Sequence, residues 1–147
     1  LALALEKADG GVIAPAVRIP VGGLEDSARY FPTPLRLLYK LLGLGDGRIA
    51  SESIVPHEID WAAGMFLLFP VNTFRDIGGF DEGYFLYYED VDICTRVWRS
   101  GGRVILHPGV TVIHAAQRAS RRKLHYMKWH LSSMLRYFVK HAWRLPR

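Results

Sequence analysis

The chain has 147 residues, half of them apolar, so it is long enough to bury a core and too rich in aromatic side chains for a disordered tail. Its single cysteine, Cys94, excludes an internal disulfide framework and is typical of a reducing compartment. The longest apolar run, from Trp61 to Val71, is about half the length of a membrane-spanning helix.

The net charge of +5 is unevenly distributed along the chain. Residues 118–147 carry nine Lys or Arg and no Asp or Glu, whereas the residues before them carry ten basic and fourteen acidic side chains. A mildly acidic body with a strongly basic C-terminal segment indicates an anionic partner at that end, such as membrane lipid, nucleotide phosphate or nucleic acid.

The N-terminal part predicts short helices and strands separated by glycine- and proline-containing loops. The opening residues read as the end of a helix, and the Gly10-Gly11 break after them leads into a short strand at 12–14. Two prolines followed by an apolar, basic run predict a loop and then a short helix over 34–42, which is either mobile or membrane-facing.

The middle of the chain predicts a strand and a short helix. The segment 59–70 is a strand candidate, and Gly64 inside it indicates that another group approaches the backbone closely. The segment after this run predicts a short helix with Asn72 as its N-cap and Gly78 as its stop.

An aromatic run at 80–88 leads into a second helix, which we expect over 90–100 and which Gly101 ends. Positions i, i+3, i+4 and i+7 of this helix form its predicted buried face: Val91, Cys94, Thr95 and Trp98. A cysteine on this face is expected in the core rather than as a nucleophile.

The C-terminal part predicts two short strands over 103–115, broken at Pro108-Gly109, and then a long helix over 120–141. Basic residues occupy much of the surface of this helix. Its predicted apolar stripe consists of Leu124, Met127, Leu131, Leu135, Phe138 and Ala142.

The carboxylates Glu89, Asp90 and Asp92 allow two interpretations. They can cap the helix, because acids in the first turn offset the helix dipole and accept bonds from free N–H groups. Alternatively, one of them is a general base, held ionised by the dipole and able to take a proton from a hydroxyl within hydrogen-bond reach. Asp90 and Asp92 lie about 200° apart around the helix, so the three acids cannot all serve one site.

His114 also allows two interpretations, since it ends an apolar strand. It is either a structural residue or a ligand of a divalent metal through a neutral imidazole nitrogen. The rest of the sequence has no metal-ligand spacing, no phosphate-binding glycine loop with its lysine and no nucleophile elbow.

Five motifs follow one another over the second half of the chain. They are a Trp-x-x-Gly strand at 61–64, a Gly-Gly-Phe-Asp-Glu turn at 78–82, an aromatic run into Glu-Asp-x-Asp at 89–92, a Gly-x-x-Val strand at 101–104 and Val-Ile-His at 112–114. In this order they resemble the second half of a family 2 glycosyltransferase, of the bacterial rhamnosyltransferase and galactofuranosyltransferase kind. The stretch 29–38 also resembles the segment before the Trp-x-x-Gly strand in that family, so the resemblance covers nearly the whole chain.

The resemblance implies an α/β fold, namely part of a nucleotide-diphospho-sugar transferase fold of the GT-A type, with a mixed sheet, flanking helices and a long C-terminal helix. It divides the chain into an acceptor-side catalytic half over 1–117 and a basic amphipathic helix over 118–147 packed on it. The implied activity is inverting transfer of a sugar from a nucleotide-diphospho-sugar to an acceptor hydroxyl, in cell-surface polysaccharide synthesis.

Roles for single residues follow from the same resemblance. Asp90 is expected to be the catalytic base, with Glu89 orienting or binding the acceptor. His114 is expected to complete a site for Mg²⁺ or Mn²⁺, which neutralises charge on the leaving diphosphate. Four further residues are expected to bind substrate: Trp61, Gly64, Asp81 and Glu82.

The expected partners are a nucleotide-diphospho-sugar donor and a glycan or lipid-linked glycan acceptor, with an anionic membrane surface and without nucleic acid. The expected location is the cytoplasm, peripheral on the inner membrane face. The alternative is a non-enzymatic basic module, in which residues 118–147 hold nucleic acid or an anionic membrane.

The sequence departs from the family in several places. The Asp-x-Asp metal motif of the family does not occur before residue 60, and the chain opens on Leu1 rather than Met. We therefore expect a C-terminal piece of a larger fold that is inactive alone. Met65 stands where a small residue is common, and Ala115-Ala116 replace a glycine often found after the histidine, so the donor sugar is not predicted.

Overall fold

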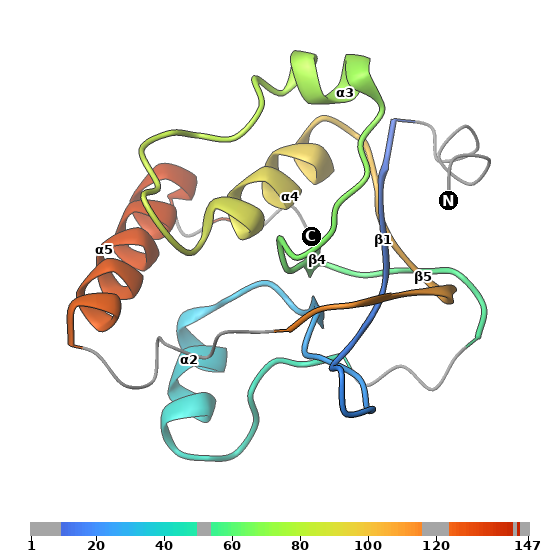
Figure 1. The fold of residues 1–147 in the computed structure, drawn as a ribbon. Helices are drawn as coiled ribbons and strands as arrows, with labels where there is room; N and C mark the ends of the chain where they lie inside the picture. The colour runs from blue at the N-terminus through green and yellow to red at the C-terminus, as the bar shows by residue number, and fades with distance from the viewer. Residues whose placement is uncertain (1–9, 50–53, 116–123, 143, 145–147) are drawn as a thin grey trace.

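The computed structural model describes residues 10–49, 54–115, 124–142 and 144, which form an α/β arrangement with helices beside a mixed sheet (Figure 1). The helix end predicted before Gly10 and the first turn of the helix predicted from residue 120 lie outside these residues.

The main sheet has three strands in the order β1-β5-β3. β1 (Val12–Arg18) pairs in parallel with β5 (Val104–Ile113), and β3 (His57–Glu58) pairs antiparallel with β5. A second, two-stranded sheet joins β2 (Ala28–Arg29) to β4 (Trp61–Ala62). Parallel and antiparallel pairs therefore meet on β5, as predicted for a mixed sheet.

β5 is one strand, not the predicted pair of strands. Its register with β1 shifts at the predicted break, since Pro15 pairs with His107 whereas Ala16 pairs with Thr111. Residues 108–110 therefore form a bulge, and both Pro15 and Pro108 lie there because proline has no N–H to give to the ladder.

The segment 59–70 is a strand only at Trp61–Ala62, where β4 lies. Farther on, Leu68 exchanges two backbone hydrogen bonds with Ile13, at 3.0 and 2.9 Å. The next helix, α3 (Val71–Asp76), has Pro70 as its N-cap, so the prediction of Asn72 was wrong. The extended backbone of Pro70 suits an N-cap, and Gly78, at φ +79°, follows the helix end as predicted.

The helices α2 (Pro34–Leu41) and α4 (Glu89–Arg99) lie within one residue of their predicted bounds. Figure 1 shows α4 between the strands β1 and β5 and the long C-terminal helix α5 (Leu124–His141). Because α4 packs on both sides, its buried surface is wider than the predicted face: Ile93 and Val97 are buried as well, and Trp98 is half-buried. Cys94 lies in this core, and burial raises the pKa of its thiol to about 12.

α5 turns a different face to the protein than predicted. Met127, Leu131 and Leu135 of the predicted stripe are exposed. The buried side chains are mostly polar or aromatic and bond to neighbouring segments: Ser133 donates to Leu86 O, Tyr137 contacts Thr95, and His141 contacts Asp92. Phe138 of the predicted stripe is buried as expected, but counting only apolar residues missed the polar members of the buried face.

Candidate active site

A cavity of about 160 Å³ lies beside the N-terminus of α4. Its walls come from β2, α2, β4, the aromatic run, α4 and α5. Three kinds of side chain line it: the cations Arg29, Arg36 and Lys40, the rings of Tyr30, Trp61, Tyr87, Tyr88 and His130, and the carboxylates Asp46, Glu89 and Asp90. Cations, aromatic faces and carboxylates together suit a polar ligand that carries both sugar rings and negative charge.

Asp90 is held in this cavity by two backbone donors. The N–H of Gly64 donates to its Oδ2 at 3.0 Å, and the N–H of Val91 donates to its Oδ1 at 2.8 Å. The close approach that the sequence predicted at Gly64 is therefore the approach of the Asp90 carboxylate. A Cβ at position 64 would lie 3.5 Å from the Cβ of Asp90, an ordinary contact, so the N–H group matters more here than the missing side chain.

The pKa of Asp90 is raised above its ordinary value because burial removes water from the carboxylate. The two backbone N–H groups and the charge of Arg29 oppose this rise without cancelling it. Burial therefore opposes the ionisation that the position of Asp90 at the helix N-terminus favours. A carboxylate with a raised pKa binds a proton more readily, which is the property that a general base needs.

Glu89 lies next to Asp90 and shares its environment. Burial, followed by the charge of Asp90, raises the pKa of Glu89. Its Oε2 is buried and has no hydrogen-bond partner among the described residues. The carboxyl group thus retains an acceptor atom for a bound molecule.

The turn that presents these acids has unusual backbone geometry. Tyr87 and Tyr88 have φ angles of +67° and +68°, in the left-handed region that residues with a Cβ rarely adopt. Such a conformation costs on the order of 1 kcal/mol per residue. The Tyr88 ring packs against Tyr137 and His130 of α5, with centroids 5.6 and 5.4 Å away, and this packing holds the turn.

The opposite wall of the cavity is built from β4 and the segment before α2. The indole Nε1 of Trp61 donates to the carbonyl of Tyr30 at 2.9 Å, and the Arg29 guanidinium lies 5.8 Å from the Trp61 ring centroid. Arg36 donates to the carbonyl of Phe31 at 2.9 Å and lies over the Tyr30 ring. These contacts fix the ring and the cations before any ligand binds.

Sequence reasoning missed the cations of this wall. Arg36 and Lys40 are one helical turn apart, and Leu37 lies beside them on the side that faces the cavity. The i, i+4 spacing of two cations on a leucine-rich helix was the available signal. Arg29, Tyr87 and His130 had no such signal, because only the fold brings them together.

Asp81 and Glu82 do not line the cavity. Asp81 accepts hydrogen bonds from Arg136 at 3.0 and 3.1 Å, from Lys140 at 2.7 Å and from the N–H of Gly83 at 2.8 Å. The bond from Lys140 is the largest cause of the lowered pKa of Asp81. Asp81 thus ties its loop to α5, while Glu82 is exposed. Their roles in substrate binding stay predictions.

Asp92 faces away from Asp90, as its position on the helix predicted. It is fully buried, and its Oδ1 lies 2.9 Å from His141 Nε2 and 2.7 Å from Lys140 Nζ, while Arg96 donates to its Oδ2 at 2.8 Å. Burial acts to raise the pKa of Asp92, but the bonds from His141 and Lys140 and the charge of Arg96 lower it to about 2. Asp92 joins α4 to α5 and does not reach the cavity.

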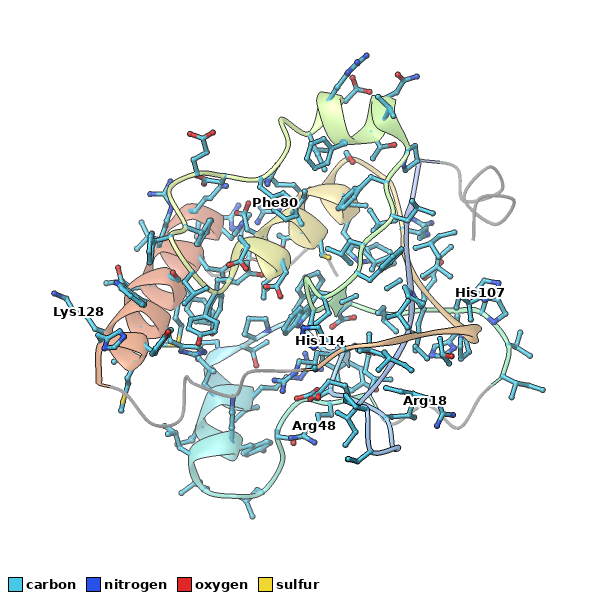
Figure 2. All side chains as sticks on the ribbon, viewed as in Figure 1. Arg18, Arg48, Phe80, His107, His114 and Lys128 are labelled. Atoms are coloured by element: carbon cyan, nitrogen blue, oxygen red, sulfur yellow. The ribbon has the colours of Figure 1, made fainter. Side chains whose placement is uncertain are left out.

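His114 follows the C-terminal end of β5 (Figure 2), where its backbone N–H donates to the carbonyl of Arg18 at 2.9 Å. Its Nδ1 is buried without a hydrogen-bond partner in the described part of the chain, but the ring does not line the cavity of Asp90. Within residues 10–49, 54–115, 124–142 and 144, no three His, Cys, Asp or Glu side chains are grouped so that they could hold a metal ion. These residues do not form a metal site by themselves, and the role of His114 as a ligand stays a prediction.

Known proteins resemble the chain over most of its length. A family described as the N-terminal domain of galactosyltransferase matches residues 48–128. Rhamnosyltransferase WbbL of Escherichia coli strain K12 is 36% identical over 117 residues, which cover 78% of this chain and 44% of WbbL. The N-acetylglucosaminyl-diphospho-decaprenol L-rhamnosyltransferase of Mycobacterium tuberculosis is 31% identical, with 92% of this chain and 48% of that protein covered. The chain therefore spans about half the length of these relatives.

The solved structure of GalNAc-T7 with UDP, GalNAc and Mn²⁺ superposes with a TM-score of 0.57 over 92% of this chain and 27% of that one. At 15% sequence identity, this likeness concerns the fold alone. It confirms the predicted α/β fold of the GT-A type.

Proposed function

The chain belongs to the family 2 glycosyltransferases, with rhamnosyltransferases among its relatives, and on this premise we propose that the protein transfers a sugar from a nucleotide-diphospho-sugar to a hydroxyl of a glycan acceptor. The setting is the synthesis of a cell-surface polysaccharide. The observation that carries the proposal is Asp90, a carboxylate with a raised pKa, fixed by two backbone N–H groups in a cavity lined by aromatic rings and cations.

Asp90 acts as the general base of an inverting reaction. Its carboxylate removes the proton of the acceptor hydroxyl, and the oxygen attacks the anomeric carbon of the donor from the face opposite the diphosphate. The new glycosidic bond forms as the bond from the anomeric carbon to the diphosphate breaks, and the diphosphate leaves with the electron pair. The proton remains on Asp90, whose raised pKa favours this end state.

Three neighbouring residues position the acceptor. The Trp61 ring, fixed through its indole N–H, offers a flat face for a sugar, and Gly64 orients Asp90 through its own N–H. Glu89 accepts a hydrogen bond from a second acceptor hydroxyl through its unpartnered Oε2. His114 contributes at most one ligand to a divalent metal, and the other ligands come from outside the described residues.

The acceptor is a glycan attached to a lipid through a diphosphate. Support for this class comes from the decaprenol-linked substrate in the name of the mycobacterial relative and from Arg29, Arg36 and Lys40 in the cavity wall, which suit phosphate oxygens. No helix in the described residues is both long and apolar enough to cross a membrane. We place the protein on the cytoplasmic side, peripheral on the inner membrane, because the proposed acceptor is linked to a lipid. In this scheme residues 1–117 belong to the acceptor-side half, and α5, within residues 118–147, supports it.

Replacing Asp90 by Asn in the full-length protein tests the base assignment. Turnover is expected to fall about 10²–10⁴-fold, because the amide cannot accept the proton. Thermal unfolding shows whether the fold is kept, and Asp76→Asn, at an exposed position on α3, is the matched control. Normal turnover in the Asp90 variant would reject the assignment. Salt-dependent oligonucleotide binding without sugar transfer would instead favour the basic-module alternative.

A further inference from the structure

The helix α5 contributes the imidazole of His130 to the cavity of Asp90. The ring is half-buried and packs against Tyr87 and Tyr88, with centroids 5.4 Å from both. These two tyrosines line the same cavity. Contacts with the aromatic turn therefore fix the position of the imidazole before any ligand binds.

The two ring nitrogens of His130 have no partner in the described protein. Within residues 10–49, 54–115, 124–142 and 144, neither of them makes a hydrogen bond. Neither nitrogen is enclosed, because the buried nitrogens without a partner in this part of the chain belong to other side chains: Arg96, His107, His114 and His141. A polar group that lines a cavity, is held in place and lacks a protein partner is available to a ligand.

The charge state of His130 follows from its surroundings. Burial, followed by the positive charges of Lys40 and Arg29, lowers the pKa of His130, so the imidazole is neutral near neutral pH. A neutral imidazole has one N–H donor and one nitrogen that accepts. The cations of the cavity only donate, and its ionised carboxylates only accept. His130 therefore suits a group that both donates and accepts, and a sugar hydroxyl is such a group.

We propose that His130 forms a hydrogen bond with a hydroxyl of the acceptor sugar and holds that sugar in the cavity beside Asp90. This role rests on the proposed function, because it takes a glycan as the ligand. Phosphate is the less suitable partner, since it favours a protonated imidazole, whereas burial and the charges of Lys40 and Arg29 favour the neutral one. Phosphate oxygens also find donors in the cations of the cavity wall.

The alternative is that His130 only supports the turn that presents Asp90, since its ring packs against Tyr88. The two roles need different parts of the side chain: support needs the flat ring, and binding needs the nitrogens. His130→Phe keeps an aromatic ring and removes both nitrogens. His130→Gln keeps a donor and an acceptor and removes the ring. His125→Phe is the matched control, because His125 lies on the same helix, is exposed and does not line the cavity.

The test is acceptor binding by the full-length protein, measured by calorimetry. The probe is N-acetylglucosaminyl diphosphate on a short prenyl chain, after the head group in the name of the mycobacterial relative. In His130→Phe the dissociation constant of the probe should rise about tenfold, because one hydrogen bond is lost in a partly buried site. His130→Gln should bind the probe more tightly than His130→Phe, and His125→Phe should bind it like the unmodified protein. Nucleotide-sugar binding should be unchanged in all three variants.

Analogues of the probe that each lack one sugar hydroxyl locate the bond. The analogue without the hydroxyl that His130 contacts should bind the unmodified protein about tenfold more weakly, and His130→Phe should cause no further loss with it. The other analogues should still lose about tenfold in that variant. A side chain that only supports the turn would weaken the binding of every analogue alike.

Three results would overturn the proposal. They are a His130→Phe variant that binds the probe as tightly as the unmodified protein, an equal loss for all the deoxy analogues, or imidazole nitrogen resonances of His130 that do not shift when the unmodified protein binds the probe. The last measurement needs no variant, and thermal unfolding establishes that each variant keeps the fold.

The same data separate this proposal from the proposed function. If the unmodified protein does not bind the probe, the proposed acceptor class fails, and the role of His130 fails with it. If Asp90→Asn keeps its turnover, the proposed base fails, while the binding results for His130 are unaffected.

Discussion

Asp90 and Asp92 lie two residues apart at the start of α4, yet their surroundings give them opposite properties. Asp90 has two backbone donors and a pKa raised by burial, whereas Asp92 has cationic partners and a pKa of about 2. The helix dipole and the local sequence are nearly the same for both. The difference therefore comes from distant segments: β4 and the cavity wall on one side, and α5 on the other.

The two sites also differ in what they do for the molecule. The Asp92 network closes a buried contact between helices, with His141 2.9 Å and Lys140 2.7 Å from one carboxylate oxygen. Asp90 faces a cavity and keeps a carboxylate in a place where its charge is poorly solvated. Asp92 thus stabilises the contact between the helices. Asp90 is ionised less readily than an ordinary carboxyl group, a property that is common at functional sites.

The largest expected effect on stability comes from removing the Asp92 carboxylate and the network of bonds around it. Asp92→Ala should lower the free energy of unfolding by about 3–5 kcal/mol, because it removes the carboxylate that Arg96 and His141 bond to in the interior. Urea unfolding measures the change, and Glu82→Ala, at an exposed carboxylate, is the control and should change stability little. A loss as small as that of the control would mean that the network is not formed.

Asp90 and Asp92 should contribute to the pH dependence of stability with opposite signs. The lowered pKa of Asp92 adds stability above the unfolded pKa, and this is lost as the pH falls toward 2, in total about 2 kcal/mol. The raised pKa of Asp90 has the opposite effect, so stability falls as the pH rises from about 4 through the raised value.

Unfolding of Asp90→Asn and Asp92→Asn measured across pH 2–8 would reveal both slopes. Relative to the unmodified protein, the Asp90 variant should gain stability with rising pH, and the Asp92 variant should lose it. If the free energy of unfolding changed with pH in the same way in both variants, the proposed difference between Asp90 and Asp92 would be contradicted.

A smaller effect is expected at Asp81, whose ion pairs with Arg136 and Lys140 lie nearer to solvent. Asp81→Asn should reduce stability by about 1 kcal/mol, with the loss weakened by salt. Sugar transfer measured on the same variant tests the substrate-binding role that the sequence predicts. Unchanged turnover would leave Asp81 with its structural role alone.

The smallest effect is expected at Gly64. Gly64→Ala keeps the N–H that bonds to Asp90 and adds a Cβ at an ordinary contact distance of 3.5 Å, so stability should change by less than about 1 kcal/mol. Turnover should fall less than about tenfold, far less than in Asp90→Asn. A loss as large as that of Asp90→Asn would show that the space beside Gly64, rather than its N–H, serves the reaction.

The order of motifs predicted the fold, and periodicity predicted α2 and α4 well. It also separated Asp90 from Asp92, because helical geometry is a local property. The cavity wall was harder to predict from the sequence, because Arg29, Tyr87 and His130 meet only through tertiary packing. The buried face of α5 was predicted only at Phe138 for the same reason. Tyr137 and His141 are buried because they bond to residues of α4 that lie more than forty positions earlier.

The left-handed turn at Tyr87-Tyr88 was also outside the reach of sequence reasoning, because aromatic residues normally favour extended backbone. The turn is held by rings of α5 rather than by its own preference. The membrane-facing alternative for residues 34–42 stays a prediction.

That turn ties the C-terminal helix α5 to the segment that presents Asp90. Tyr88 leans on Tyr137 and His130, so truncating the chain at residue 118 would remove the buttress and let the two tyrosines relax toward ordinary backbone angles. Asp90 would then be held by the N–H groups of Gly64 and Val91 without the support of the turn before it. Engineers who shorten proteins of this kind for solubility should therefore preserve α5, even though it contributes no reacting group.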